Sequence, residues 1–233
     1  MKAIIIDDER LARAELKKLL QEFPEIEVID EAANAEEGIT KIESLHPDLI
    51  FLDIQMPGKT GFEMLSDLEK TPQVIFTTAY DEFALKAFEV NALDYLLKPI
   101  EPKRLADAIQ KLHLPEGKES RSETDEFVNT SLLTELDQVF VKDGEKCWFV
   151  KLGEIRLFES VGNYAKVFFG TNKPLILKSL NALEERLDEK SFFRANRKHI
   201  VNLRMIDKIE PYFNGGLLLE LKGGEKIEVS RRQ

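Results

Sequence analysis

The stretch Leu49-Ile50-Phe51-Leu52-Asp53 places four apolar residues directly before a carboxylate. An apolar run of this length predicts a strand that is buried on both faces of its sheet. Related runs occur at 3–6, 28–29, 74–76 and 95–97, and helical spacing fills the segments 9–22, 35–45, 61–69, 81–90 and 102–112. This alternation predicts an α/β fold with a five-stranded, doubly wound parallel sheet.

Polar side chains follow these strands at their carboxyl ends. Asp7 and Asp8 follow the first strand, and Asp53 ends the third. Thr78 ends the fourth strand, and Lys98 follows the fifth. Because these ends meet at one edge of a parallel sheet, we expect the three carboxylates to lie together, where their oxygen atoms suit Mg²⁺. A carboxylate beside this ion can attack phosphorus, while an ammonium and a hydroxyl group share the charge of the phosphoryl oxygens.

Two alternatives compete with a phosphoryl-acceptor site. The acidic residues could be ordinary solvated loop residues, but their order along the strand ends makes this interpretation weak. A phosphohydrolase that uses Asp53 as its nucleophile is also weak. Enzymes of the haloacid dehalogenase type need a second Asp two residues after the nucleophile, and position 55 is Gln.

Residues 1–114 resemble the receiver domain of bacterial two-component response regulators, which has a flavodoxin-like fold. The resemblance rests on four stretches: Ile6–Glu9, Leu52–Gly58, Thr77–Ala79 and Asp94–Pro99. It implies that a sensor histidine kinase phosphorylates Asp53 and that Mg²⁺ is the cofactor. It assigns the ion to Asp8, Asp53 and the backbone carbonyl of Gln55, with Asp7 acting through water.

The same resemblance implies roles for three further residues. Thr78 would bind the phosphoryl group and Lys98 would pair with it. The peptide bond between Lys98 and Pro99 is expected to be cis, which costs little before proline. Tyr95 is expected to become buried when Thr78 moves toward the phosphate, with an ordinary packing role as the alternative. We expect the receiver to assist its own Mg²⁺-dependent phosphorylation and dephosphorylation without being a turnover enzyme.

The surface of the fourth helix, fifth strand and fifth helix is a candidate homodimer face. It carries charges of both signs, on Lys86, Glu89, Asp94, Lys103, Arg104 and Asp107. A solvated surface of mixed charge is the alternative, since charges at an interface rim steer association more than they set affinity. We expect phosphorylation to favour a homodimer.

Charge separates the chain into parts. Residues 1–113 carry 13 Lys and Arg against 23 Asp and Glu, whereas residues 139–233 carry 18 against 13. Residues 115–137 have the charged composition of a linker. Beyond them, the segments 139–142, 147–152, 155–159, 164–169, 174–178, 199–203, 217–221 and 226–229 are strand-like, and 179–188 is expected to form a helix. Residues 138–233 are therefore predicted to form a mostly-β domain whose positive charge suits a polyanion.

Three basic segments of this second domain are candidates for contact with DNA. They are Arg194–Arg204, the turn at Ser160–Lys166, and Ser230-Arg231-Arg232. Lys, Arg, Asn and Tyr side chains suit phosphate groups and base edges. We find neither a helix-turn-helix pair nor the cysteines of a zinc finger, so loops or strands would make the contacts.

The same region resembles a LytTR-type DNA-binding domain. The resemblance rests on Phe158–Tyr164, Lys178–Leu180, Phe192–Asn202 and Val229–Arg232. It implies binding of double-stranded DNA at paired direct repeats, with contacts from Asn163, Tyr164, Lys166, Arg197, Lys198, Arg231 and Arg232. Many members have His-Arg-Ser where this chain has Asn196-Arg197-Lys198, so the base preference is open. The chain stops at Gln233, where members commonly continue into a short helix, and a truncated domain is an alternative.

The favoured interpretation is a phosphorylation-controlled transcriptional regulator of a two-component system. An adaptor whose second domain binds protein rather than DNA is the alternative, and the salt dependence of binding would distinguish the two. The sequence has one cysteine, which excludes an intrachain disulfide. It shows neither a signal peptide nor an apolar stretch long enough for a membrane helix, so we expect a cytoplasmic protein without membrane contact.

Overall fold

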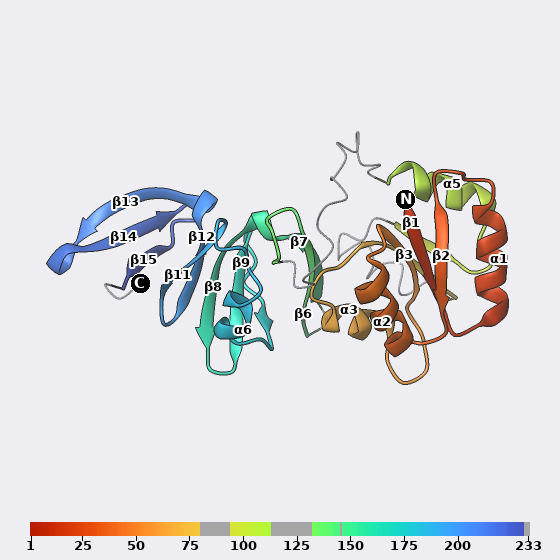
Figure 1. The fold of residues 1–233 in the computed structure, drawn as a ribbon, viewed down its shortest axis with the longest axis horizontal. Coiled ribbons are helices and arrows are strands. Elements are labelled where there is room, and N and C mark those ends of the chain that lie inside the picture. Colours follow the sequence, from red (N-terminus) through yellow and green to blue (C-terminus); the bar gives the residue numbers. More distant parts are fainter. Residues whose placement is uncertain (80–93, 113–131, 145, 231–233) are drawn as a thin grey trace. The chain divides into compact units, whose positions relative to one another are not determined.

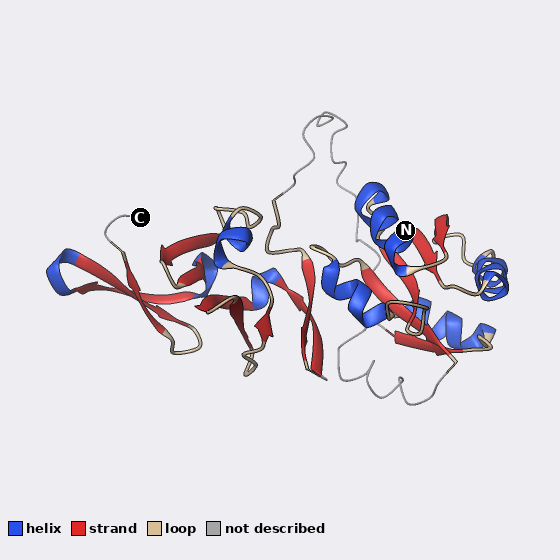
Figure 2. Cartoon of the chain, turned by 90° about the horizontal axis from the view of Figure 1, so that it is seen from below, coloured by secondary structure: helices blue, strands red, loops and turns tan. Residues whose placement is uncertain are grey.

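The computed structural model describes residues 1–79, 94–112, 132–144 and 146–230 (Figure 1). The chain divides into two compact units. The first is built on a parallel sheet covered by helices, whereas antiparallel strands dominate the second (Figure 2).

The sheet of the first unit has the strand order β2-β1-β3-β4-β5, and all neighbouring strands are parallel. Its members are β1 (Lys2–Ile6), β2 (Glu27–Ala32), β3 (Leu49–Asp53), β4 (Gln73–Thr78) and β5 (Asp94–Leu97). The central strands β1 and β3 are almost wholly buried, because helices cover both of their faces. The predicted five-stranded, doubly wound parallel sheet is confirmed.

The helices of this unit are α1 (Arg10–Leu20), α2 (Ala35–Leu45), α3 (Gly61–Asp67) and α5 (Pro102–Gln110). Helices α1 and α5 cover one face, where Leu16 and Leu105 join the same core as Phe51. Helices α2 and α3 cover the other face, where Phe62 packs against Phe76 with ring centroids 4.9 Å apart. The expected helix at 81–90 lies outside the described residues.

Side-chain caps begin two of these helices close to the loops that follow β2 and β3. Asn34 accepts a hydrogen bond from the backbone amide of Glu37 at the start of α2. Thr60 and Glu63 form a capping box at the start of α3, in which each side chain accepts a hydrogen bond from the other's backbone amide. This capping sets the first turn of α3 and therefore determines which residues form the loop between Asp53 and the helix.

Two larger sheets and a hairpin follow residue 132 in the chain, and the two sheets form the body of the second unit. The five-stranded sheet has the order β10-β9-β8-β12-β11 and is antiparallel throughout. Its strands are β8 (Ile155–Val161), β9 (Tyr164–Phe169), β10 (Leu175–Ile176), β11 (Phe192–Asn196) and β12 (His199–Asn202). The three-stranded sheet contains β13 (Ile206–Tyr212), β14 (Gly216–Leu221) and β15 (Lys226–Val229), and the hairpin contains β6 (Gln138–Asp143) and β7 (Lys146–Lys151).

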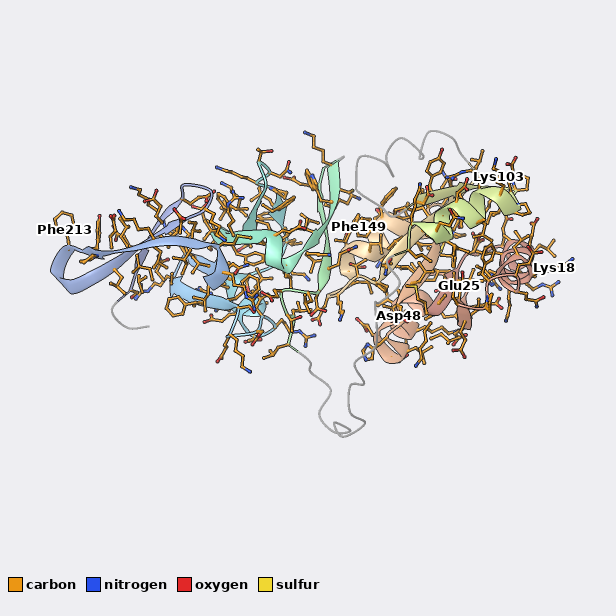
Figure 3. All side chains as sticks on the ribbon, turned by 90° about the horizontal axis from the view of Figure 1, so that it is seen from above. Lys18, Glu25, Asp48, Lys103, Phe149 and Phe213 are labelled. Atoms are coloured by element: carbon orange, nitrogen blue, oxygen red, sulfur yellow. The ribbon has the colours of Figure 1, made fainter. Side chains whose placement is uncertain are left out.

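Short helical segments complete the second unit. They are the helix α6 (Leu180–Glu184) and the 3₁₀ turns η1 (Leu152–Glu154), η2 (Leu203–Met205) and η3 (Phe213–Gly215). Ser179 caps α6 by accepting a hydrogen bond from the amide of Ala182. The turn η3 closes the β13–β14 hairpin and leaves Phe213 at its tip, where the side chain is 79% exposed (Figure 3).

The larger sheets of the second unit share one core. Leu157 and Val201 of the five-stranded sheet pack with Leu219 and Ile227 of the three-stranded sheet. An ion pair also joins the two sheets, because Nη2 of Arg156 on β8 lies 2.9 Å from Oε1 of Glu225, which precedes β15. The three-stranded sheet is therefore held against the five-stranded one by apolar packing and by a largely buried ion pair.

The second unit differs from the sequence-based expectation in two respects. Strands β11 and β13 were not predicted, because their apolar residues are interrupted by charged ones and β13 contains Pro211 near its end. Helix α6 is shorter than the expected 179–188. Within the expected linker 115–137, the apolar side chain of Leu133 is buried and its backbone bridges Leu187.

Candidate functional site

Three carboxylates and an ammonium group meet at the carboxyl edge of the parallel sheet. Oxygen atoms of Asp7, Asp8 and Asp53 all lie within 4.8 Å of one another. The Nζ atom of Lys98 lies 2.7 Å from Oδ2 of Asp7 and 2.7 Å from Oδ2 of Asp53. Parallel register explains this meeting, because β1 pairs with β3 along their length, β3 with β4, and β4 with β5.

Backbone groups and an arginine hold the acidic residues in place. The amide of Glu9 donates to Oδ1 of Asp7 at 2.9 Å, and the amide of Gln55 donates to Oδ1 of Asp53 at 3.1 Å. Nη1 of Arg13, on α1, donates to the backbone carbonyl oxygen of Asp7 at 2.6 Å. Arg13 was not predicted as a site residue, because only the first turn of α1 brings it back over the acidic pair.

Burial and hydrogen bonds together shift the pKa values of Asp53 and Lys98. Burial raises the pKa of the Asp53 carboxyl, although the hydrogen bond from Lys98 opposes the shift. Burial also lowers the pKa of Lys98, but the hydrogen bonds to Asp53 and Asp7 outweigh it, and the net direction is upward. Lys98 is therefore held in its charged form between two carboxylates.

Gly61 allows α3 to begin directly against the end of β3. A Cβ atom at this position would lie 2.5 Å from the backbone carbonyl oxygen of Asp53, closer than any normal contact. The amide of Gly61 also donates to the carbonyl oxygen of Ile54 at 2.9 Å. This requirement was not predicted from the sequence, since it depends on the approach of two backbones.

The donor set of the cluster fits a hard divalent cation. Carboxylate oxygens within 4.8 Å of one another can share one ion, and Asp8 presents its side chain to solvent. Gln55 is exposed on the loop immediately after Asp53. The structure thus contains an acidic cluster in which Asp7, Asp8 and Asp53 could hold Mg²⁺.

The other predicted residues of the first unit lie around the same edge. Thr78 is completely buried at the end of β4, and its carbonyl oxygen accepts a hydrogen bond from the amide of Lys98 at 2.7 Å. Tyr95 is half-buried on β5. The peptide bond between Lys98 and Pro99 is cis, as predicted.

One residue of the candidate dimer face is not on a surface. The Asp94 carboxylate is only 1% exposed and pairs within the chain with Arg104 at 3.1 Å and Lys111 at 2.9 Å. A buried carboxylate needs such partners, so Asp94 is unavailable to a second copy. Lys103 and Asp107 remain exposed or partly exposed on α5, whereas Lys86 and Glu89 lie outside the described residues.

In the second unit, two turns that are distant in sequence lie at the same end of the five-stranded sheet. Gly162 and Asn163 connect β8 to β9, and Arg197 and Lys198 connect β11 to β12. Strand β12 runs antiparallel to β8, so its first residues pair with the last residues of β8. The amide of Ser160 accordingly donates to the carbonyl oxygen of Lys198 at 2.8 Å. We call this end of the sheet, with the residues 159–166 and 194–199, the basic edge.

The third basic segment approaches the same edge. The amide of Ser230, just after β15, donates to the carbonyl oxygen of Ala195 on β11 at 2.8 Å. Arg231 and Arg232, which follow in sequence, lie outside the described residues. Among the described residues, Ser230 thus lies beside β11, close to the β11–β12 turn.

Most predicted contact residues of the basic edge are accessible. Asn163, Arg197 and Lys198 are exposed, and Tyr164 is 46% exposed. Lys166 is half-buried, with Nζ 3.7 Å from Oε2 of Glu159.

Three residues for which no individual role was predicted organise the basic edge. Glu159 also faces His199, whose Nε2 lies 3.8 Å from Oε1. Arg194 donates to the carbonyl oxygens of Asn196 and Arg197, at 2.8 Å and 2.9 Å. The contact between Glu159 and His199 depends on the register of β8 and β12, whereas the bonds of Arg194 are local to the β11–β12 turn.

The fold and the acidic cluster define a receiver joined to a second, mostly-β unit. Residues 3–110 match the family model described as the response regulator receiver domain, and residues 145–233 match the LytTr DNA-binding domain. Among the described residues, every helix is too short or too polar to cross a bilayer.

Relatives along the whole chain agree with this division. An uncharacterized response regulatory protein of Vibrio cholerae is 41% identical over 100% of this chain and 94% of its own length. The sensory transduction protein LytT of Bacillus cereus is 36% identical over 99% and 95%, and the transcriptional regulatory protein BtsR of Escherichia coli is 37% identical over 100% and 95%. The chain therefore belongs to the two-component response regulators that carry a receiver domain and a LytTR DNA-binding domain.

Two solved structures resemble the separate units. The response regulatory domain of mrkE from Klebsiella pneumoniae is 35% identical, with a TM-score of 0.44, and the match covers 48% of this chain and 94% of that one. A LytTr DNA-binding domain from Bacillus cereus is 26% identical, with a TM-score of 0.39, and the match covers 41% and 87%.

Proposed function

We propose that Asp53 is the phosphoryl acceptor of this response regulator and that the basic edge binds double-stranded DNA. One observation carries the proposal for Asp53. Its buried carboxylate lies 2.7 Å from an ammonium group and within 4.8 Å of two further carboxylates, which is the surrounding that a phosphorylated aspartate and its cation require. A sensor histidine kinase would be the phosphoryl donor.

The chemistry is a transfer between two groups. A carboxylate oxygen of Asp53 attacks phosphorus, the bond to the donor nitrogen breaks, and an acyl phosphate forms. Bound Mg²⁺, held by Asp8, Asp53 and the backbone carbonyl of Gln55, with Asp7 through water, would supply positive charge to the phosphoryl oxygens. Lys98 already stands beside Oδ2 of Asp53 and would pair with the transferred group. The same surroundings would assist attack by water, which returns the receiver to its resting form.

Thr78 and Tyr95 are the proposed elements of the switch. Thr78 is buried at the end of β4 and directly follows Thr77, the residue that pairs with Asp53 on the neighbouring strand, and we propose that its hydroxyl moves to bind a phosphoryl oxygen. Tyr95 is half-buried, and we propose that it becomes more buried in the phosphorylated state. We propose that this change favours a homodimer through the exposed residues of α5.

The basic edge supplies the contacts to DNA in this proposal. Asn163, Tyr164, Lys166, Arg197 and Lys198 are the described contact residues, and Arg231 and Arg232 follow Ser230. A homodimer would place two basic edges on paired repeats, and the second contact would then form at a high effective concentration. We propose that the protein acts in the cytoplasm, because it would need access there to both the DNA and the phosphoryl donor.

Phosphorylation can be tested with acetyl phosphate and Mg²⁺, followed by mass spectrometry of the intact chain. We expect the wild-type protein and Asp67→Asn, a control at the end of α3, to gain one phosphoryl group. Asp53→Asn should gain none. Unchanged labelling of Asp53→Asn would refute the assignment.

DNA binding can be tested by capture of fragmented genomic DNA, with and without beryllofluoride as a phosphoryl mimic. We expect fragments that share a repeated motif, enriched further by the mimic and lost as salt rises. Arg197→Ala should reduce capture. Lys190→Ala is the control, because Lys190 is an exposed cation that precedes the opposite end of β11 and lies outside the three basic segments. Salt-insensitive retention of a protein, with no enriched DNA, would favour the adaptor.

A further inference from the structure

Asn196, the last residue of β11, makes side-chain bonds in two directions at the basic edge. Its Oδ1 atom accepts a hydrogen bond from the amide of Lys198 at 2.8 Å and lies 3.0 Å from Nδ1 of His199. Its Nδ2 atom donates to the carbonyl oxygen of Glu228 at 2.7 Å. The donor and acceptor partners differ, so they fix the orientation of the amide. One short side chain therefore joins the β11–β12 turn to strand β15.

This connection crosses between two sheets. Strand β11 is the edge of the five-stranded sheet, and β15 is the edge of the three-stranded sheet. The hydrogen bond from Ser230 to Ala195 is a second link between the same two strands. The Asn196 side chain thus links the turn at Arg197 to β15, which ends directly before Ser230. The family resemblance assigns arginine contacts with DNA to that turn and to the two residues that follow Ser230 in sequence.

Asn196 does not stabilise the core of the unit. It is only partly buried, and its bonds to Lys198 and Glu228 lie at exposed positions. Arg194 also supports the turn independently, since it donates to the carbonyl oxygens of Asn196 and Arg197. Loss of the Asn196 side chain should therefore leave the fold intact and loosen the position of the turn relative to β15.

We propose that Asn196 is a positioning residue that holds the Arg197–Lys198 turn and the end of β15 at a fixed separation for reading DNA sequence. This inference rests on the proposed binding of DNA by the basic edge. Base contacts need several side chains at defined positions, whereas phosphate contacts tolerate small displacements. A loosened turn should accordingly weaken binding to a specific site and spare non-specific binding.

Specific and non-specific binding can be measured with the full chain in beryllofluoride. The probes are a duplex that carries the motif recovered by the wild-type protein and a scrambled duplex of the same composition. We expect Asn196→Ala to bind the motif about tenfold more weakly than the wild type does, which corresponds to the loss of one or two hydrogen bonds. It should bind the scrambled duplex as well as the wild type does. The salt dependence should not change, because no cation is removed. Asn181→Ala, on the exposed surface of α6, is the control.

Hydrogen exchange of the DNA-free protein tests the connection itself. In Asn196→Ala, the amides of Lys198 and Ser230 should exchange faster than in the wild type. Asn196→Asp keeps an oxygen acceptor for Lys198 but sets an oxygen against the carbonyl of Glu228, so Ser230 alone should lose protection.

Each contrary result has a separate meaning. Equal loss of affinity for both duplexes, or loss for neither, would overturn the positioning role while DNA binding stands. Unchanged exchange at both amides would also overturn it. If the wild-type protein binds no duplex at all, the proposed function fails and the positioning role fails with it.

Discussion

Lys98 and Asp53 form an ion pair, with Nζ 2.7 Å from Oδ2, although 45 residues separate them in the chain. The same ammonium pairs with Asp7 at 2.7 Å. A single cation therefore balances two carboxylates of the cluster that we assign to Mg²⁺, and it competes with the ion for their charge. The competition has a measurable consequence.

Substitution of Lys98 by Met should strengthen Mg²⁺ binding and slow phosphorylation. Removal of a competing positive charge beside the carboxylates should make the free energy of Mg²⁺ binding more favourable by about 1 kcal/mol, or roughly fivefold in affinity. Loss of the group that pairs with the phosphoryl oxygens should lower the rate of labelling by acetyl phosphate about 100-fold. Mg²⁺ titrations followed by thermal unfolding, together with labelling rates, would check both effects.

Lys41→Met is a matched control for this variant. Lys41 also bridges two carboxylates, Asp30 and Glu37, each at 2.9 Å, but away from the acidic cluster. It should change neither Mg²⁺ affinity nor labelling. Weaker Mg²⁺ binding in Lys98→Met would contradict the competition.

Gly61→Ala should destabilise the first unit and displace Asp53. The added Cβ atom would meet the carbonyl oxygen of Asp53 at 2.5 Å, and backbone atoms cannot yield as a flexible side chain can. We expect a loss of about 2 kcal/mol or more in the free energy of unfolding, with reduced labelling of the folded protein. Urea unfolding would measure the first effect.

Gly58→Ala separates crowding from backbone conformation. Gly58 has a φ of +83° and open space where a Cβ atom would stand. Its substitution should cost only about 1 kcal/mol, from the left-handed backbone alone. Equal losses in the two variants would show that the contact with Asp53 is not the dominant cause.

Glu159→Gln should strengthen binding to DNA. Glu159 lies 3.7 Å from Nζ of Lys166, in the middle of the basic edge, and its charge offsets that of the lysine. The variant frees Lys166 for a phosphate, so affinity at low salt should rise and the salt dependence should steepen by about one counterion. Fluorescence anisotropy at several salt concentrations would measure both.

Glu220→Gln controls for a general change in charge. Glu220 pairs with Lys226 across strands at the same distance of 3.7 Å, but on the three-stranded sheet. If both variants raise affinity equally, the position of Glu159 on the basic edge has no special effect.

His199 should make the stability of the protein depend on pH. Burial holds the pKa of His199 below its usual value, although Glu159 opposes the shift. The unfolded chain therefore binds the proton more readily, and the free energy of unfolding should fall as pH decreases below about 6.5. The decrease should end once pH passes the lower pKa of the folded state.

The pH effect can be isolated by difference. The free energy of unfolding is measured between pH 7.5 and 5.5 for the wild type and for His199→Gln, which cannot titrate. We expect the wild type to lose more stability than the variant over this interval. A larger loss of stability in the variant would contradict the prediction that burial lowers the pKa of His199.

The sequence by itself determined the first unit and the identity of its acidic residues. Apolar runs such as Leu49–Leu52 can be satisfied only by burial on both faces, and the carboxyl ends of parallel strands share one edge. The meeting of Asp7, Asp53 and Lys98 followed from that rule before any distance was known. The turn residues Arg197 and Lys198 were likewise visible as a basic segment beside a predicted strand.

Only the tertiary structure decided which residues act together. Gly61 is required because two backbones approach each other, and Asp94 is withdrawn from the surface because Arg104 and Lys111 surround it. Strand β11 and the link from Asn196 to Glu228 were invisible in the sequence. Contacts of this kind join segments that are far apart in the chain, and their geometry comes from strand register and sheet packing, which local periodicity does not encode.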